Sequence, residues 1–140
     1  MKSGFDYSEY TKWANNLGIV RKDFRNWLES FLLTEAQRVI KSAKEIQQNY
    51  EYMKADGTIK TGVIDTGTML NSWYITDIIV SGGNLQVEIG NSVDYASYIE
   101  YGHHSFEGVY ILTISINEVY EQLPARFNQE WLSFLNSKGV

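Results

Sequence analysis

The sequence predicts an α+β fold in which a long amphipathic helix near the amino terminus packs on a small antiparallel β-sheet, followed by C-terminal helices. Apolar residues recur at spacings of three and four over residues 20–48, residues 73–91 have the pattern of a β-hairpin, and residues 108–135 return to helical spacing. With 140 residues and 44% hydrophobic content, the chain can build one core but not two ordinary ones. A small sheet of this kind needs the long helix to cover its apolar face.

The first 18 residues are expected to form a short arm that precedes this domain. Asp6 and Glu9 suit the start of a helix, and Gly18 suits its end. The division predicted from the sequence is therefore an N-terminal arm or short helix over residues 1–18 and a single α+β domain over residues 19–140.

The long helix is predicted from one apolar stripe. At the usual rise per residue it is roughly 40 Å long and spans the whole domain. Charged residues lie mostly off the stripe. The stripe consists of Phe24, Trp27, Leu28, Phe31, Leu32, Val39, Ile40, Ala43 and Ile46.

The helical period is lost over residues 49–62. Asp56-Gly57 and Gly62 mark this segment as a loop or a flexible β-turn excursion. The arm and this segment both carry little apolar surface, so both are expected to become ordered only on assembly with other proteins.

A β-hairpin with one buried face is predicted over residues 73–91. Its first half is rich in Ile and Val, and Ser81-Gly82-Gly83-Asn84 forms the turn. In its second half Leu85, Val87 and Ile89 alternate with polar residues, which places these three on the buried face.

Two later segments fit more than one structure. Residues 94–101 suit either a helical turn or a short strand, and Gly102 ends the element in both cases. Residues 108–116 alternate like a strand, but over 108–123 the helical pattern is longer, which favours a helix. Pro124 is expected to end or kink that helix, and a final amphipathic helix is expected to follow it.

Composition excludes several classes of protein. The chain has no cysteine, so neither disulfides nor thiolate metal sites can stabilise it, which suits a reducing compartment. Its net charge of -5 argues against direct binding to nucleic acid, which needs a dense basic surface. No signal pattern and no stretch of about 20 apolar residues is present, so a soluble protein made in a cytoplasm, without a membrane partner, is expected.

The four Trp, ten Tyr and six Phe have two interpretations. Large aromatic residues bury most of their area, so an ordinary core accounts for most of them. Tyrosine and tryptophan are also enriched at protein interfaces, where they contribute contact area at a low entropic cost. The second interpretation predicts a protein partner.

One enzymatic alternative comes from the two histidines. His103 and His104, with Asp94 and Glu100 nearby, could form the site of a small metal-dependent or hydrolytic enzyme. However, adjacent residues on an extended segment point to opposite faces, whereas metal sites on helices use separations of three or four. Because this spacing is poor, no metal and no cofactor is predicted.

Other candidates for catalysis are equally weak. Ser72 and Ser97 lie in no nucleophile-elbow context. Asp65 and Glu100 could act as a carboxylate pair, but aspartate followed by threonine and glycine is more often a turn or a helix cap. The sequence therefore predicts that the protein is not an enzyme.

Two blocks of sequence resemble a known family. Residues 63–73 read VIDTGTMLNSW and resemble the V-D-T-G-x-L-R-x-S-W signature of the gene-product-ten-like family of tailed-phage tail components. Residues 90–103 read GNSVDYASYIEYGH and resemble the N-x-x-x-Y-A-x-Y-V-E-x-G-H signature that follows it in that family. Residues 108–112 resemble its G-x-x-M-L segment. The matching residues are Asp65, Thr66, Gly67, Leu70, Ser72, Trp73, Tyr95, Ala96, Tyr98, Glu100, Gly102 and His103.

The resemblance implies a structural role in phage assembly. It implies a tail-completion or head–tail neck protein that forms a homo-oligomer, commonly a hexameric ring, and joins the tail tube to the head-side connector. The partners would be the tail-tube or tail-terminator protein and the head-connector protein. The protein would be located in the virion, in the tail or neck, after assembly in the cytoplasm of the bacterial host. None of the matching residues is catalytic in what the family implies.

The two blocks are expected to act through their position in the fold. The run from Asp65 to Ser72 suits a turn that is fixed by local hydrogen bonds and that connects the long helix to the sheet. The run from Tyr95 to His103 then forms the corner after the hairpin. Loss of a cap in an Asp65→Ala variant would lower stability by about 1 kcal/mol.

Overall fold

The computed structural model describes the chain except for residues 1, 7, 17, 20, 54–55, 63–66, 104–105 and 140, and for the side chains of residues 2–6, 16, 52–53, 60, 103 and 106. The predicted α+β fold is confirmed, and the helices that follow the sheet are α3 and α4. In chain order the elements are β1 (Lys2–Asp6), α1 (Ser8–Asn16), α2 (Arg21–Asn49), β2 (Glu51–Met53), β3 (Ile59–Thr61), β4 (Trp73–Ile75), β5 (Ile79–Ser81), β6 (Asn84–Asn91), α3 (Ala96–Tyr101), β7 (Gly102–His103), β8 (Phe106–Glu107) and α4 (Ile111–Ser137).

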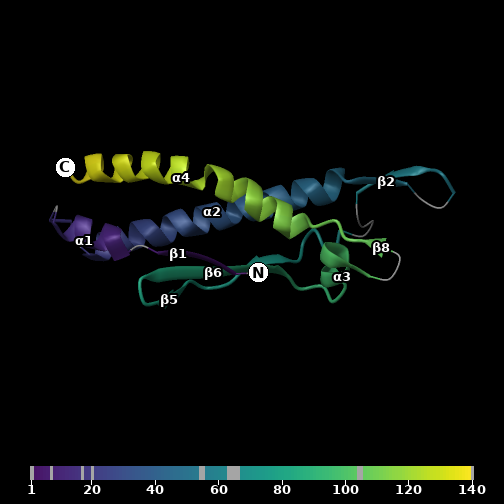
Figure 1. Ribbon diagram of the computed structural model, residues 1–140, viewed down its shortest axis with the longest axis horizontal. Coiled ribbons are helices and arrows are strands. Elements are labelled where there is room, and N and C mark those ends of the chain that lie inside the picture. Colours follow the sequence, from purple (N-terminus) through teal and green to yellow (C-terminus); the bar gives the residue numbers. More distant parts are fainter. Residues whose placement is uncertain are drawn as a thin grey trace.

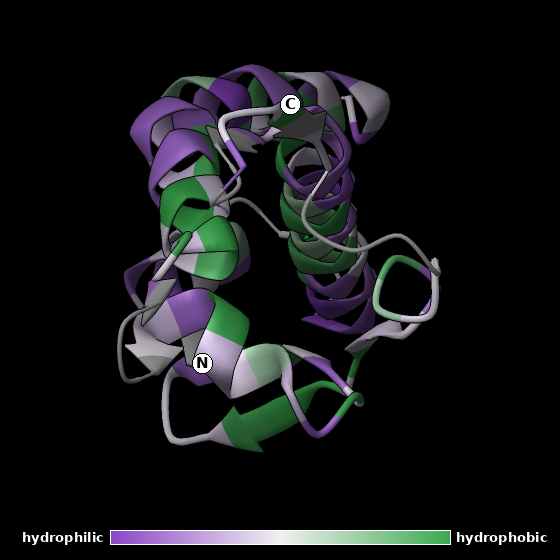
Figure 2. Ribbon diagram, turned by 90° about the vertical axis from the view of Figure 1, so that its right-hand side faces the viewer, coloured by the Kyte–Doolittle hydropathy of each residue, from purple (hydrophilic) through white to green (hydrophobic). Residues whose placement is uncertain are grey.

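Two long helices run side by side along the molecule, and the main sheet covers one side of the pair (Figure 1). The predicted long helix is confirmed as α2, which has 29 residues. In the end-on view the hydrophobic residues of both helices and of the sheet gather around the interior (Figure 2). The core lies between these three layers, and its buried members on α2 are Phe24, Leu28, Leu32, Ala36 and Val39.

The main sheet is built around β6. Strand β1 pairs with one edge of β6, and β4 and β5 pair with the other, all antiparallel. Leu85, Val87 and Ile89 of β6 are buried in alternation, as the period of two predicts. The predicted turn is confirmed, because Ser81 lies opposite Asn84 and the chain reverses at Gly82, which has a φ of 60°.

The first 18 residues contain a strand as well as a helix. Asp6 was expected to cap the helix, but it lies in β1 opposite Asn84, and the helix begins at Ser8. Helix α1 packs by Ala14, which is buried, and by Tyr10, whose ring meets those of Phe127 and Trp131 at 4.8 and 5.8 Å. Helix α1 therefore contacts α4 as well as α2.

An aromatic cluster fills the end of the core where α1, α2 and α4 meet. Phe127 and Trp131 of α4 lie against Trp27 at centroid distances of 5.4 Å each. Among the residues whose side chains the structure describes, eight rings belong to the cluster, in edge, stacked or tilted contacts, which supports the core interpretation for most of this set of aromatics. They are Tyr10, Trp13, Phe24, Trp27, Phe31, Phe127, Trp131 and Phe134.

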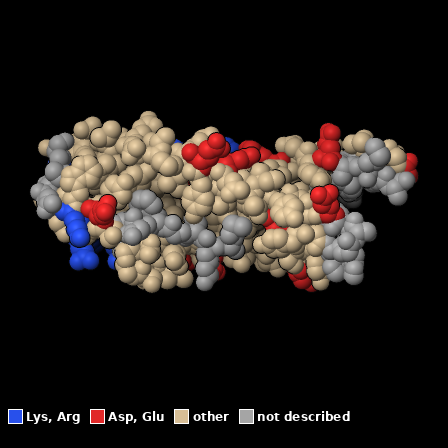
Figure 3. Space-filling view, in the orientation of Figure 1, with Lys and Arg blue, Asp and Glu red and all other residues tan. Residues whose placement is uncertain are grey.

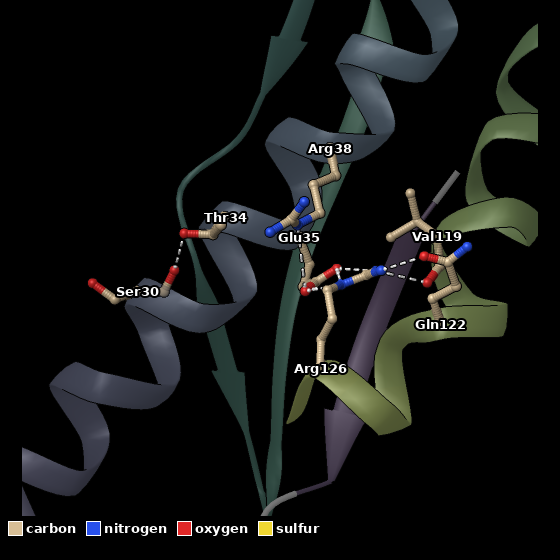
Figure 4. A network of polar contacts seen from close by, with 7 residues as sticks. All are labelled: Ser30, Thr34, Glu35, Arg38, Val119, Gln122 and Arg126. Carbon is tan, nitrogen blue, oxygen red and sulfur yellow. Dashed lines mark hydrogen bonds and ion pairs between the residues drawn. The ribbon is translucent and has the colours of Figure 1, made fainter. Parts of the chain in front are cut away.

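The last helix continues through Pro124. Residues 111–137 form the single helix α4, so the helix preferred for 108–123 is confirmed, whereas no new helix begins after the proline. Figure 1 shows that α4 changes direction near its middle, as a proline kink requires. The Arg126 guanidinium donates from Nη2 to the backbone oxygen of Val119, one turn before the kink, at 2.9 Å (Figure 4). Packing of both halves against α2 keeps them in one helix.

The two remaining ambiguous segments are also settled. Residues 49–62 contain the β2–β3 hairpin, so of the two structures predicted for this segment the β-turn excursion is correct. Within 94–101 the chain forms the helix α3, and Gly102 with a φ of 87° ends it. Within the described part of the chain, no helix combines the length and the apolar character needed to span a bilayer.

Candidate functional site: the joint between the two motif blocks

The two motif blocks meet at one end of the main sheet. Because β4 and β6 are antiparallel, Trp73 at the end of the first block lies opposite Asn91, which precedes α3. Of the twelve predicted motif residues, Asp65 and Thr66 lie outside the described residues, and His103 is described by its backbone alone. The place where the two blocks meet, from Gly67 to Trp73 and from Asn91 to Ala96, is here called the joint. The other nine motif residues surround this joint, lie on α3 or follow it directly.

The first block forms a compact turn before β4. Gly67 has a φ of 70°, a conformation that favours glycine. The amide of Asn71 donates to the Gly67 oxygen at 3.0 Å, and the Ser72 hydroxyl donates to the Thr68 oxygen at 2.5 Å. Leu70 is half-buried within this turn. The locally bonded turn expected here is present over its described residues.

Asn91 connects the two blocks. Its side-chain amide donates from Nδ2 to the backbone oxygen of Met69 at 2.6 Å, and its Oδ1 accepts from the Val93 amide at 3.1 Å. The Ser92 amide donates to the Ser72 oxygen at 3.1 Å. Asn91 was not among the twelve residues singled out from the sequence, although it stands at the leading asparagine of the second signature and the alternation of Leu85, Val87 and Ile89 placed it on the inward face.

Trp73 attaches the joint to the long helix. Its indole Nε1 donates to Oε1 of Gln47 on α2 at 3.1 Å, and Gln47 is buried. Around this bond lies a second, smaller apolar cluster, to which α2, both blocks and the start of α4 contribute. Three of the motif residues therefore pack against a core. The cluster's members are Ala43, Met69, Val109 and Ile111, with Ile46, Trp73, Val93, Tyr95, Ala96 and Ile99 packed against them.

Glu100 caps the amino terminus of α4. Its carboxylate accepts from the Leu112 amide at 2.8 Å, from the Thr113 amide at 3.0 Å and from the Thr113 hydroxyl at 2.8 Å. These amides belong to the first helical turn, where an amide has no acceptor within the helix. A carboxylate also interacts favourably with the positive end of the helix dipole. The motif glutamate thus fixes α3 to α4.

At Gly108, just before α4, the backbone passes very close to α3. An added Cβ at Gly108 would lie 2.5 Å from the Glu100 oxygen and 2.7 Å from the Tyr101 carbonyl carbon, so only glycine fits. The amides of Val109 and Tyr110 then donate to the oxygens of Ile99 and Glu100 at 2.8 and 3.1 Å. Tyr110 itself has a φ of 56°, a rare conformation for a large side chain.

This geometry does not support the metal or hydrolytic site considered from the sequence. Glu100 is buried and its two carboxylate oxygens accept three hydrogen bonds, so it is not available to bind a metal or to transfer a proton. Asp94 is exposed, His104 lies outside the described residues, and so does the side chain of His103. Among the residues that the structure describes, no group of three or more His, Asp or Glu side chains is placed to hold a metal ion.

A hollow of about 230 Å³, here called the motif groove, opens between β4, β6 and α3. Tyr74 lies across Gly90 on the strand opposite, with its hydroxyl 2.6 Å from the position of an added Cβ. Tyr74 and Tyr101 are both exposed at this groove. The groove is lined by Met69, Trp73, Tyr74, Glu88, Ile89, Gly90, Asn91, Ala96, Ser97, Glu100, Tyr101 and Leu112.

Comparisons with known proteins agree with the resemblance seen in the two blocks. The family described as "Bacteriophage HK97-gp10, putative tail-component" matches residues 12–102. A curated protein of Bacillus subtilis (strain 168), "Uncharacterized protein YqbI", is 28% identical over 100 residues, which are 67% of this chain and 49% of that protein. The chain therefore spans about half the length of the curated relative that it matches. No solved structure matches the chain.

Proposed function

The chain belongs to the HK97 gp10-like family of bacteriophage tail components, and on this premise we propose that it is a tail-completion or neck subunit. In this role it forms a ring, six-fold as is common in such assemblies, which joins the tail tube to the head-side connector. Its partners are copies of itself, the tail-tube or tail-terminator protein and the head-connector protein. It is located in the tail or neck of the virion.

The observation that carries this proposal is the use made of the motif residues. Glu100, Trp73 and Asn91 hold α2, the sheet and α4 together through side-chain hydrogen bonds. These hydrogen bonds fix the positions of α2, the sheet and α4 relative to one another. An assembly subunit needs this rigidity, because its contact surfaces must face neighbouring subunits in a fixed geometry. The enzymatic alternative through His103, His104, Asp94 and Glu100 loses its central carboxylate, because Glu100 caps α4.

The surface also suits protein partners. Figure 3 shows acidic atoms over the middle of the long helices and basic atoms mainly at one end of this face. Exposed tyrosines and aliphatic residues lie elsewhere, including Tyr74, Tyr101, Ile59 and Ile79. Aromatic side chains of this kind contribute most of the binding energy at many protein interfaces.

The division of the chain is part of the proposal. Residues 19–140 act as one domain, and residues 1–18 act as an arm whose strand β1 lies at the edge of the sheet. Edge strands and short terminal segments open more easily than core elements. Hydrogen exchange on the free protein is expected to be faster in β1 than in α2, and equal protection of both would contradict the division.

A gene deletion tests the function directly. A phage that lacks the gene is expected to accumulate filled heads and separate tails, and expression of the wild-type chain in the host restores joined particles. The gene is expected to lie between the head-connector and tail-tube genes. Intact infectious particles without the gene would contradict the proposal.

A further inference from the structure

A basic surface, here called the basic corner, lies at the end of the molecule where α1 is followed by α2. It comprises residues 8–25, which include four basic and two acidic residues, a net charge of +2. Three of the cations, Lys12, Arg21 and Lys22, are exposed. Figure 3 shows basic atoms at the end where Figure 1 places α1. Trp13 lies next to Lys12 in sequence and is 48% exposed, although it is a large apolar residue.

Trp13 is held in place while about half of it faces solvent. Its ring lies 5.5 Å from that of Trp131 on α4, measured between centroids. Helix α1 is closed behind it, because the Ile19 amide donates to the Ala14 oxygen at 3.0 Å and Gly18 has a φ of 74°. Tryptophan is enriched among the residues that contribute most to binding at protein interfaces. A preformed surface of this kind also loses little entropy on binding.

The motif groove lies in a part of the chain with the opposite charge. Residues 67–113, which form and flank it, contain five acidic residues and neither lysine nor arginine, a net charge of -5 with histidine neutral. Lys2 of β1 lies opposite Glu88, and the sum stays negative when this lysine is included. Opposite charges on two surfaces steer their encounter and favour their contact.

The groove also suits an inserted aromatic side chain. Its volume of about 230 Å³ is below the range of about 300–1,000 Å³ that is usual for small-molecule pockets, so a single large side chain is the better fit. Met69, Ile89 and Leu112 contribute apolar surface to its lining, and Tyr74 and Tyr101 are exposed at it. Aromatic rings attract one another in edge and offset contacts.

We propose that the basic corner of one subunit docks at the motif groove of a second copy of the chain, with Trp13 inserted beside Tyr74 and Tyr101. The corner and α3 lie toward opposite ends of the molecule, so the groove that the corner enters belongs to another copy (Figure 1). Corner and groove are different surfaces, so the contact is head to tail. Such contacts form a ring when the rotation closes. This inference rests on the ring in the proposed function and identifies its interface.

Directed disulfide formation between two variants tests the contact, since the chain has no cysteine of its own. Glu9 lies one helical turn before Trp13 on α1, and Ser97 lines the groove; both are exposed. Glu9→Cys and Ser97→Cys are made as separate proteins, and the Ser97→Cys protein is converted to a mixed disulfide with thionitrobenzoate. When the two are mixed, the thiolate of the Glu9→Cys protein attacks the sulfur of the Ser97→Cys protein, which forms an intersubunit disulfide and releases thionitrobenzoate. The disulfide is expected to form at least about ten times faster than in the control, because docking raises the effective concentration of the thiolate.

The matched control removes another exposed glutamate from a helix. Glu121 lies on α4, and Glu121→Cys changes the net charge by the same amount as Glu9→Cys, so it reports the rate of random collision with the activated protein. An increase of the salt concentration from about 0.05 to about 0.5 M is expected to reduce the advantage of Glu9→Cys, because salt screens the attraction between exposed charges. Equal rates at low salt, or an advantage that salt does not reduce, would overturn the proposed contact.

Charge reversal provides a second readout that needs no cysteine. Arg21→Glu/Lys22→Glu replaces two cations of the basic corner by anions and is expected to convert the ring to monomers. Lys41→Glu/Lys44→Glu makes the same change of net charge further along α2 and is expected to leave the ring intact. The contact is wrong if the first double variant still forms the ring, or if both double variants lose it equally.

The mass of the wild-type oligomer separates the two proposals. If the wild type forms a ring and Glu9→Cys reacts no faster than Glu121→Cys, the corner contact is wrong and the proposed function stands. If the wild type is a monomer at every concentration, the self-assembled ring itself is contradicted.

Discussion

Arg126 on α4 and Glu35 on α2 form a bidentate ion pair between the two long helices. Nε of Arg126 donates to Oε1 of Glu35 at 2.8 Å, and Nη2 donates to Oε2 at 2.6 Å (Figure 4). Glu35 is only 4% exposed, and the second cation near it, Arg38, lies 3.8 Å away. The hydrogen bond to Glu35 raises the pKa of Arg126, against the opposing effect of burial, so the guanidinium stays charged across the neutral range.

Removal of the arginine is expected to destabilise the protein strongly. Arg126→Met leaves the Glu35 charge buried without its bidentate partner, which costs about 3–5 kcal/mol for pairs of this kind. The free energy of unfolding from urea titration measures the loss. The double variant Glu35→Leu/Arg126→Met is expected to recover most of it, because apolar residues of similar size replace the whole pair.

An exposed ion pair provides the control for that variant. Lys138 and Asp23 lie 2.8 Å apart at the surface, and pairs of this type contribute less than about 1 kcal/mol. Lys138→Met is therefore expected to change stability little. A loss as large as that of Arg126→Met would show that burial of Glu35 is not the cause.

The cap at the start of α4 gives a second prediction. Glu100→Ala is expected to lower the free energy of unfolding by about 2–3 kcal/mol, because two backbone amides lose a charged acceptor. Thr113→Val removes one of the three bonds and is expected to cost about 1 kcal/mol. Both values come from denaturant titration of the purified variants.

A glutamate that is exposed on α4 controls for the change in net charge. Glu121→Ala is expected to stay within about 0.5 kcal/mol of the wild type, as surface substitutions usually do. If Glu100→Ala were equally mild, the capping role of the motif glutamate would be wrong.

The two close-packed glycines of the joint are expected to respond differently to alanine. At Gly108 the added Cβ meets backbone atoms at 2.5–2.9 Å, which cannot move without separating α3 from α4. Gly108→Ala is therefore expected to cost about 3 kcal/mol. At Gly90 the Cβ meets the far end of the Tyr74 ring, which can turn away, so Gly90→Ala is expected to cost about 1 kcal/mol. Thermal melting of both variants decides between these values, and equal costs would contradict the explanation.

The sequence predicted the elements whose pattern is local. The spacing of Phe24, Leu28 and Leu32 identified α2, and the alternation of Leu85 and Val87 identified β6. Side chains return to the same face about every 3.6 residues in a helix and every two residues in a strand, so the two patterns differ. The kink at Pro124 was expected, but continuation of the helix through it depends on packing against α2. Asp6 looked like a cap because cap signals are local, whereas its pairing with β6 is not.

The roles of the site residues depended on contacts distant in sequence. Glu100 was identified as a motif residue, but its capping role required α3 and α4 to lie side by side. Glu35 and Gln47 were not singled out, although both fall on the apolar stripe of α2, and a polar residue at such a position signals a buried partner. The family resemblance is confirmed by the match over residues 12–102, while the ring and its partners remain proposals.

The central claim is that this chain is a subunit of a closed ring. Native mass spectrometry of the purified full chain, over a range of concentrations, tests it most directly. The account predicts one dominant closed species, with the mass of six copies. A monomer at all concentrations, or a continuous ladder of open oligomers, would contradict it.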